Sequence, residues 1–494
     1  MNDMNKNLAS LSPALVWKHF SQIVNIPRPS GDEDRIREYI ISVAQGLGLE
    51  CREDEAHNVY VRKPATPGME DRKGIILQAH LDMVPQKNND KVFDFHADPI
   101  EAYIDGEWVT ADGTTLGADN GIGAAAILAV LEDNSISHGP VEALFTATEE
   151  TGMDGAFGLE AGMLQGQILL NLDSETEGEL YVGCAGGLDA NITFSYNSVF
   201  APMHGRTAMR IDVKGLKGGH SGIQIVCQRA NANKLLFRLL RLAATKVEVL
   251  LASVDGGGLR NAIPREATAV VLVKSDDVAT FRALVAEYEA TVQAEFVGIE
   301  DSISVTAAET EAPDKMMPAD TAVAVVRAVT GCPDGVVKMS PAMAGLVETS
   351  TNLARVVSDG STVRIQCLLR SSVASEKDAL GDAIAAVFQL AGAEVELTGS
   401  YDGWNPDMNS PILKAMRESY HELYGKEPLV TAIHAGLECG IIGSKYPGLD
   451  MISFGPTICY PHSPDEKVEI ASVAKFYDFL LHTLRNAPRK QMQP

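Results

Sequence analysis

The chain has 494 residues, which is more than one ordinary hydrophobic core accommodates and therefore predicts at least two domains. Its 41 Lys and Arg residues against 66 Asp and Glu residues give a formal net charge of −25. An acidic surface repels nucleic acids and anionic membranes, so we expect neither as a partner. The sequence also has no uncharged apolar run of about 18 residues, so no membrane span is expected.

The seven cysteines are widely scattered and form no C-x-x-C pair. This pattern argues against a disulfide framework or a structural zinc site, and it indicates a reducing compartment. Residues 1–18 lack the basic patch and apolar run of a secretory signal. We therefore expect a cytoplasmic protein.

Residues 1–186 alternate helical and strand patterns, which predicts a largely parallel sheet covered by helices. The pattern Ser30-Gly31-Asp32-Glu33 fits a capping box and predicts a helix that ends near Gln45. A second helix is predicted at 120–131, and strands are predicted at 74–84, 141–148 and 168–172. In such sheets, ligands bind beyond the carboxyl ends of the strands.

From residue 187 to about residue 399 the pattern changes to that of an α+β domain. Strands are predicted there at 208–213, 267–273 and 362–369, with a helix at 230–244. The last segment, 400–494, has a predicted helix at 411–424, a strand at 451–454 and a C-terminal helix ending near Arg485. These patterns alone leave open whether the last segment rejoins the first.

Metal-capable side chains lie at the ends of three predicted strands: His80 and Asp82 close the first, the adjacent pair Glu149 and Glu150 follows the second, and Asp173 follows the third. Because neighbouring strand residues point to opposite faces, the two adjacent glutamates can serve different tasks. A carboxylate such as Asp82 can fix the tautomer of a metal-binding imidazole. Taken singly, each of these residues also fits an ordinary surface ion pair or a solvated loop.

Three further positions lie in loops rich in glycine or proline, namely Asp119, His220 and His462. Asp119 precedes the Ala-rich helix and also fits a helix N-cap. The glycines beside His220 indicate a mobile or closely approached loop. Together these side chains offer mixed nitrogen and carboxylate ligands, which suit Zn²⁺, Mn²⁺ or Co²⁺ better than Ca²⁺. The number of carboxylates indicates two ions rather than one.

The ordered set of motifs resembles the M20 metallopeptidases, and within them the aminoacyl-histidine dipeptidases, nearly from end to end. The matching segments are N-I-P-R-P-S-G at 25–31, Q-A-H-L-D-M-V-P at 78–85, L-G-A-D-N-G at 116–121, T-E-E-T-G at 148–152, N-L-D-S-E at 171–175, G-G-H-S-G at 218–222, N-A-I-P at 261–264, H-A-G-L-E-C-G at 434–440 and P-H-S-P at 461–464. Single motifs are weak signals, whereas their order along one chain is specific.

The resemblance implies a site for two divalent metal ions, first of all Zn²⁺, with Co²⁺ or Mn²⁺ as alternatives. The implied ligands are His80 and Asp173 for one ion, Glu150 and His462 for the other, and Asp119 as the bridge. The peptide bond that follows the bridging residue would be cis.

The resemblance also implies roles in catalysis and substrate binding. Asp82 would orient His80, Glu149 would act as general base on a water that bridges the metals, and His220 would stabilise the oxyanion. The implied substrate-binding residues are Asn261, Arg370 and Gly436. A guanidinium such as that of Arg370 grips a carboxylate with two hydrogen bonds, although the same residue fits a surface charge at a strand end. No ligand role is implied for Glu438.

The fold that the resemblance implies is an α/β protein of two domains. Residues 1–186 and 400–494 would form a di-metal catalytic domain with a mostly parallel mixed sheet flanked by helices. Residues 187–399 would form an inserted α+β lid domain. This lid is longer than in the short-lidded dimers of the family, so it is open whether the protein is a monomer or a homodimer and whether His220 acts within its own subunit.

The implied activity is metal-assisted hydrolysis of short dipeptides with a free amino terminus, including Xaa-His such as β-alanyl-histidine (carnosine). Another amide hydrolase of the family, such as a tripeptide aminopeptidase or an N-acyl amino acid deacylase, is the alternative. A protein that kept the fold only for binding is a rival of a different class, which the intact ligand positions argue against. A two-metal phosphoesterase is disfavoured because the chain lacks a basic phosphate cradle.

Overall fold

The computed structural model describes residue 5 and residues 7–490. The chain forms two compact units. The first comprises Met1–Gly183, Pro406–Ala432 and Leu437–Pro494, and the second comprises Cys184–Asn405 and Ile433–Gly436. The expected two-domain α/β class is confirmed, while the domain limits near 187 and 400 stay a prediction.

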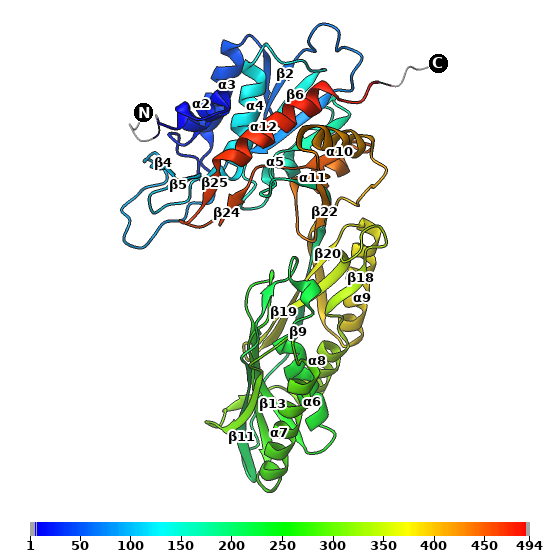
Figure 1. Ribbon diagram of the computed structural model, residues 1–494. Helices are drawn as coiled ribbons and strands as arrows, with labels where there is room; N and C mark the ends of the chain where they lie inside the picture. Colours follow the sequence, from blue (N-terminus) through cyan, green and yellow to red (C-terminus); the bar gives the residue numbers. More distant parts are fainter. Residues whose placement is uncertain (1–4, 6, 491–494) are drawn as a thin grey trace. The chain divides into compact units, whose positions relative to one another are not determined.

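The first unit is built on an 8-stranded mixed sheet in the order β1-β2-β6-β3-β7-β23-β8-β22. Figure 1 labels β2, β6 and β22 of this sheet. Its strands are β1 (Glu50–Glu53), β2 (Val59–Lys63), β3 (Ile75–His80), β6 (Val141–Thr146), β7 (Ile168–Asn171), β8 (Glu179–Cys184), β22 (Leu429–Ile433) and β23 (Asp450–Ser453). The pairs β6-β3, β3-β7 and β7-β23 are parallel, and the pairs β1-β2, β2-β6 and β23-β8 are antiparallel.

The parallel centre of this sheet is covered on both faces. Every residue of β3, β6 and β7 is buried, as expected for parallel strands beneath helices. The helices of the unit are η1 (Leu8–Ser10), α2 (Ala14–Ile23), α3 (Asp34–Gly46), α4 (Ala118–Glu132), α5 (Asp154–Gly158), α10 (Pro411–Tyr424), α11 (Glu438–Lys445) and α12 (Ile470–Arg485). Helix α4 packs against β3 and α2 and is buried nearly all round, which explains its Ala, Ile and Leu content.

A smaller 4-stranded sheet also belongs to the first unit, in the order β24-β25-β5-β4. Its strands are β4 (Ala102–Asp105), β5 (Trp108–Ala111), β24 (Ile458–Cys459) and β25 (Lys467–Glu469). The segment between β24 and β25 contains His462, so this small sheet fixes both ends of a loop that carries a predicted metal ligand.

The second unit is an antiparallel sheet in the order β16-β11-β15-β13-β19-β20-β9-β21, with β18 paired to β19. These strands are β9 (Gly186–Ser195), β11 (Arg206–Lys214), β13 (Val249–Gly257), β15 (Ala267–Lys274), β16 (Ser304–Glu309), β18 (Gly335–Met339), β19 (Val347–Ser358), β20 (Thr362–Ser371) and β21 (Glu394–Tyr401). The short strands β10 (Val199–Phe200), β12 (Gly219–His220), β14 (Ala262–Ile263) and β17 (Lys315–Met316) form two further pairs, β10-β17 and β12-β14.

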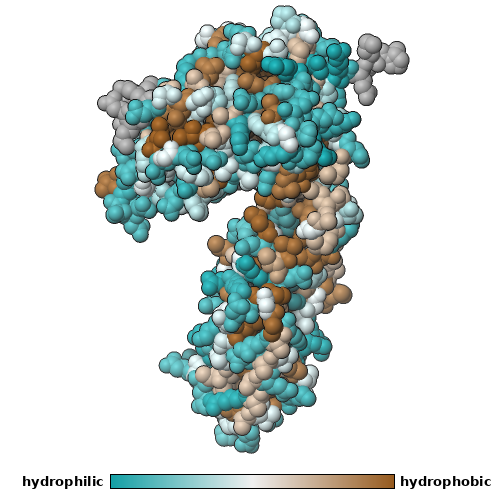
Figure 2. All heavy atoms as spheres, viewed as in Figure 1, coloured by the Kyte–Doolittle hydropathy of each residue, from teal (hydrophilic) through white to brown (hydrophobic). Residues whose placement is uncertain are grey.

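The helices of the second unit are α6 (Ala232–Ala243), α7 (Val278–Glu295), α8 (Ala319–Gly331) and α9 (Ala374–Leu390), with η2 (Ile225–Cys227) and η3 (Ser275–Asp277). Alternate residues of the strands and one face of each helix meet in a single apolar core. Figure 2 shows that hydrophilic residues cover most of the visible surface, with scattered hydrophobic areas between them. None of the described helices combines the length and apolar run needed to cross a bilayer.

Three predicted element ends were wrong, and each error lies beside the predicted site. Strand β3 ends at His80 and β6 at Thr146, so the side chains that follow them sit in loops rather than on strands. Helix α3 begins at Asp34, and Ser30 does not cap it. The hydroxyl of Ser30 donates instead to Asp82 at 2.7 Å, because a buried carboxylate needs donors more than an exposed helix end does.

Candidate metal centre

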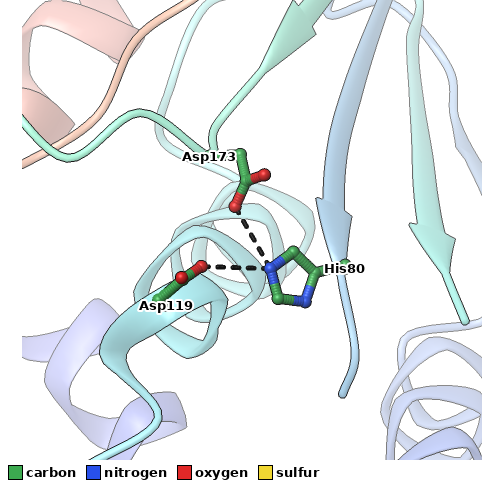
Figure 3. A group of neighbouring side chains, drawn as sticks. All are labelled: His80, Asp119 and Asp173. Carbon is green, nitrogen blue, oxygen red and sulfur yellow. Dashed lines mark hydrogen bonds and ion pairs between the residues drawn. The ribbon is translucent and has the colours of Figure 1, made fainter. Parts of the chain in front are cut away.

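The first group of candidate ligands brings together three side chains from separate elements of the first unit. His80 ends β3, Asp119 lies at the start of α4, and Asp173 follows β7. The Nε2 atom of His80 lies 3.0 Å from Asp119 Oδ1 and 3.2 Å from Asp173 Oδ1, and both carboxylates point toward that atom (Figure 3). One ligand atom from each residue lies within 4.8 Å of the others, which is the spacing of a shared cation.

The second group shares Asp119 with the first. Its other members are Glu150, from the turn after β6, and His462, from the loop between β24 and β25. His462 Nε2 lies 3.2 Å from Asp119 Oδ2 and 3.0 Å from Glu150 Oε2. The two oxygens of Asp119 thus face two different histidines, which is the arrangement expected of a bridging carboxylate.

The carboxylate of Asp82 connects the histidine of the first group to both adjacent glutamates. Its Oδ1 lies 3.2 Å from His80 Nδ1 and accepts the backbone N–H of Glu149 at 2.9 Å. Its Oδ2 accepts the backbone N–H of Glu150 at 3.1 Å and the hydroxyl of Ser30 at 2.7 Å. Burial opposes ionisation, but the hydrogen bonds, that of His80 foremost, lower the pKa of Asp82 to about 2. Asp82 therefore stays ionised and leaves Nε2 of the imidazole for a metal.

Glu149 lies in a different environment from its neighbour. Burial raises the pKa of Glu149 well above its usual value, opposed by the charge of His80 and reinforced by that of Asp173. A carboxylate with a raised pKa suits a group that accepts and returns a proton. Glu149 also forms a candidate ligand group with His80 and Glu150, so the distances alone permit it a metal contact as well.

The electrostatics of the centre favour bound cations. Hydrogen bonds that His462 donates to Asp119 and Glu150 raise the pKa of His462 to about 11, and burial raises the pKa of Asp173 to about 6. Protonation of Asp173 and of His462 is thus favoured, and both protons compensate the negative charge of the centre. Among the described residues, the buried Oε1 atom of Glu150 has no hydrogen-bond partner. Crowded carboxylates, two imidazoles and this unpaired oxygen fit two divalent ions of the Zn²⁺, Mn²⁺ or Co²⁺ type.

The loop that carries Asp119 has an unusual local backbone. Gly117 adopts a left-handed conformation with φ of 71°, and the peptide bond between Asp119 and Asn120 is cis, as predicted. The side chain of Asn120 donates hydrogen bonds to the carbonyl of Leu172 and to the carboxylate of Asp173. The residue after the bridge therefore orients a ligand of the first group, and Asp119 does not act as a helix cap.

Replacing Gly117 with alanine should destabilise the first unit strongly. The positive φ costs an alanine about 1–2 kcal/mol. The new Cβ would also lie 2.6 Å from Arg28 Nη2 and 2.9 Å from the sulfur of Met83, and overpacking of this kind adds about 1–3 kcal/mol. Gly106→Ala is the matched control, because Gly106 has a φ of 59° but open space around its Cβ position. Equal losses of unfolding free energy for both variants in urea denaturation would contradict the packing argument.

A row of buried polar side chains crosses the strands directly beneath the ligands. Gln78 on β3 donates to Thr146 on β6 at 3.0 Å and accepts from Asn171 on β7 at 2.5 Å. Ser453 on β23 donates to Asn171 at 2.5 Å. Glu438, at the start of α11, accepts from Gln78 at 2.6 Å and from Thr146 at 2.9 Å. Glu438 is thus placed as a support of this row and is absent from the candidate ligand groups.

The predicted lid residues lie in the second unit and form a cluster of their own. His220 on β12 pairs with Ala262 on β14, which places Asn261 beside it. The Nδ1 atom of His220 accepts the backbone N–H groups of Gly222 and Ile223, both at 3.1 Å. The neutral imidazole therefore carries its proton on Nε2, where it can donate to a substrate oxygen.

Arg370 and His434 complete this cluster. Both are buried, and both lie close to Gly222. A Cβ atom added at Gly222 would lie 3.2 Å from Arg370 Nε and 3.0 Å from His220 Cε1, and it would also contact the carbonyl oxygen of His434. The Nε atom of Arg370 has no hydrogen-bond partner among the described residues. Burial and the charge of Arg370 lower the pKa of His434 to about 3, and its Nε2 lies 2.7 Å from the Ser350 hydroxyl. Gly436 ends the segment that carries His434.

Sequence reasoning missed the supporting residues of both clusters. Arg28 and Glu466 are buried charged residues that bind the backbones of ligand-bearing loops, and His434 is buried beside Arg370. Arg28, Glu438 and His434 lie inside motifs that match the family, and Glu466 follows His462 by four positions. The available signal was an ionisable residue, not itself a proposed ligand, that lies inside such a motif or directly after it.

The fold and the ligand geometry agree with the comparison of the sequence with known families. Residues 76–486 match the peptidase family M20/M25/M40. The chain belongs to this family, and it is a hydrolase that acts on peptide bonds.

Two similar proteins cover almost the whole chain. The cytosol non-specific dipeptidase of Escherichia coli is 46% identical over 483 residues, which are 98% of this chain and 99% of that protein. The crystal structure of the aminoacylhistidine dipeptidase from Vibrio alginolyticus superposes with a TM-score of 0.94, at 46% identity and 98% coverage of both chains. An aminopeptidase structure from Bacillus cereus, at 15% identity and a TM-score of 0.57, covers 97% of this chain and 99% of its own and shares the fold.

Proposed function

We propose that the protein is a di-metal dipeptidase that hydrolyses short dipeptides with a free amino terminus. The observation that carries this proposal is the pair of ligand groups that share Asp119. The chain is 46% identical, over nearly its full length, to two proteins named as dipeptidases, and this identity supports the same substrate class. By analogy with the E. coli relative, we place the protein in the cytosol.

The proposed ligands are His80 and Asp173 for one ion, Glu150 and His462 for the other, and Asp119 for both. Bound there, two divalent ions, foremost Zn²⁺, would lower the pKa of a water and polarise the scissile carbonyl. The chain contributes fixed geometry, because two of the ligands are held by a neighbouring side chain, His80 by Asp82 and Asp173 by Asn120.

Glu149 is proposed as the group that takes the proton of the attacking water and returns it to the leaving amine. Two features support this role. Its backbone N–H donates to the carboxylate of Asp82, and burial raises the pKa of its carboxyl group well above the usual value, so that this group can hold a proton. Glu150, one residue further, is directed to His462 and so performs a different task.

The cluster of the second unit is proposed to bind the rest of the substrate. His220 would donate from Nε2 to the carbonyl oxygen as it becomes negative. Arg370 and Asn261 would hold the terminal carboxylate, and Gly436 would contact the substrate through its backbone. The buried, incompletely paired guanidinium of Arg370 supports this assignment, because such a group gains most from a carboxylate partner.

The proposed substrates are dipeptides that include Xaa-His, such as β-alanyl-histidine. The test is a panel of dipeptides, tripeptides and N-acylated amino acids, assayed on metal-free protein reloaded with Zn²⁺, Mn²⁺ or Co²⁺. We expect metal-dependent cleavage of dipeptides and little cleavage of the other substrates. Preferred cleavage of tripeptides would indicate an aminopeptidase, preferred cleavage of N-acylated amino acids would indicate a deacylase, and no cleavage under any loading would refute the proposal.

Arg370→Ala should raise the KM for dipeptides far more than it lowers kcat. Loss of a charge-assisted hydrogen bond costs about 2–3 kcal/mol, which corresponds to about 30- to 150-fold in affinity. The same variant should lose the preference of the wild-type protein for a dipeptide over the corresponding dipeptide amide. Arg364→Ala is the control, because Arg364 lies on the same strand with its side chain 70% exposed. An unchanged preference in Arg370→Ala would contradict carboxylate binding by this residue.

A further inference from the structure

The carboxylate of Glu466 accepts the backbone N–H groups of consecutive residues at the start of α4. Its Oε2 atom accepts from Leu116 at 2.7 Å and from Gly117 at 2.9 Å. Its Oε1 atom accepts from Ala118 at 2.8 Å and from Asp119 at 3.2 Å. Only 2% of Glu466 is exposed, so these amides replace the water that an ionised side chain normally requires. The last of them belongs to the residue shared by both ligand groups.

Glu466 also belongs to the loop that supplies a ligand to the second group. It lies four residues after His462, its N–H donates to the carbonyl of Ser463 at 3.0 Å, and its carbonyl accepts the hydroxyl of Thr110 on β5 at 2.8 Å. One side chain thus ties the loop of His462 to the loop of Asp119, although about 350 residues separate them in the sequence.

Arg28 holds the same loop from another side. Its Nη1 donates to the carbonyls of Leu81 and Asp82, both at 2.8 Å, and its Nη2 donates to the carbonyl of Gly117. The segment after His80 is therefore connected to the segment before Asp119 by one buried guanidinium. Between them, Arg28 and Glu466 connect the backbones of three loops that carry candidate ligands, without contributing a ligand themselves.

We propose that Glu466 is a positioning residue that sets the location of the bridging carboxylate between the two metal sites. This inference rests on the proposed di-metal function. Since Asp119 faces His80 and His462 with different oxygens, a small shift of its backbone changes both sites at once. Glu466 fixes that backbone at four adjacent amides, and so controls metal affinity and the coupling between the ions.

The test is Mn²⁺ binding by the full-length Glu466→Gln variant. Glutamine keeps the size of the side chain, but its amide nitrogen cannot accept a hydrogen bond, so one pair of backbone N–H groups loses its acceptor. Calorimetric titration of the metal-free protein with Mn²⁺ should show binding about 10- to 100-fold weaker for at least one ion. The electron paramagnetic resonance spectrum of the loaded variant should show altered coupling between the two ions.

Glu142→Gln is the matched control. Glu142 is also a buried carboxylate of the first unit that accepts backbone N–H groups, from Gln165 and Gly166, but no candidate ligand is among its partners. The Glu142→Gln variant should have a lower melting temperature in the metal-free form and an unchanged affinity for Mn²⁺. If Glu466→Gln does not fold, Glu466→Asp, which keeps both oxygens on a shorter side chain, should show the same weakening to a smaller extent.

The outcomes separate the inference from the function on which it rests. Failure of the wild-type protein to bind two Mn²⁺ ions would refute the di-metal site itself. A second outcome would overturn the positioning role alone. In that case the wild-type protein binds two ions, and a folded Glu466 variant binds them with the same affinity and gives the same resonance spectrum. Equal weakening by Glu142→Gln would also overturn it, because the effect would then follow from general destabilisation.

Discussion

Glu149→Gln should abolish peptide hydrolysis while both metal sites remain filled. Glutamine keeps the shape of the side chain and the backbone hydrogen bond to Asp82, but it cannot accept the proton of a water. Loss of a general base costs about 10²- to 10⁴-fold in rate, so kcat should fall by that factor with little change in KM. Metal content per chain, measured by atomic emission, should equal that of the wild-type protein.

The metal measurement distinguishes the two roles that the distances permit for this residue. If Glu149 were a ligand beside His80 and Glu150, the variant would lose metal as well as activity. Glu160→Gln is a control of the same chemistry at an exposed position of the same unit, and it should change neither quantity. Full activity in Glu149→Gln would exclude this residue as the base.

Asp119→Asn should have the second large effect, because one oxygen of Asp119 lies beside His80 and the other beside His462. An amide offers one oxygen instead of two, so it can no longer face His80 and His462 together. Removal of metal-dependent stabilisation of the transition state should cost about 4 kcal/mol, which corresponds to about 10³-fold in kcat/KM. Metal titration should show weaker binding at both sites.

Asp173→Asn provides the comparison for this prediction. Asp173 belongs to the group of His80 and is absent from that of His462. Its replacement should therefore weaken one site and spare the other. The bridging assignment of Asp119 fails if both variants weaken the same single site to the same degree.

Much of the centre could be predicted from the sequence because parallel strands deliver their carboxyl ends to one edge of a sheet. His80 ends strand β3, Glu150 and Asp173 follow strands β6 and β7, and these three strands are neighbours in the sheet. Their hydrophobic runs were plain in the sequence, so the existence of the strands was secure. The assignment of separate roles to Glu149 and Glu150 depended on the family resemblance. Strand β6 ends at Thr146, so the alternation of side chains along a strand does not apply to these two residues.

The residues that support the centre could not be predicted in the same way. Glu466 and Arg28 bind backbone amides and carbonyls, which every residue type possesses, so no matching residue elsewhere in the sequence marks the contact. Ser30 has the local pattern of a helix cap, but a partner 52 positions away determines its hydrogen bond. Local sequence patterns describe interactions between near neighbours in the chain. The contacts of Glu466, Arg28 and Ser30 depend instead on the tertiary fold.

The position of β23 in the first sheet has a consequence for how the protein is made. This strand, at Asp450–Ser453, inserts between β7 and β8, which precede it by more than 250 residues in the sequence. On the ribosome, β7 therefore keeps an unpaired edge until the whole second unit has been synthesised, and such edges are prone to aggregation. The ligands of the first group all emerge early, whereas the second group waits for His462. During translation the nascent chain thus carries the three ligands of the first group long before Glu466, which fixes the backbone of Asp119, has been made.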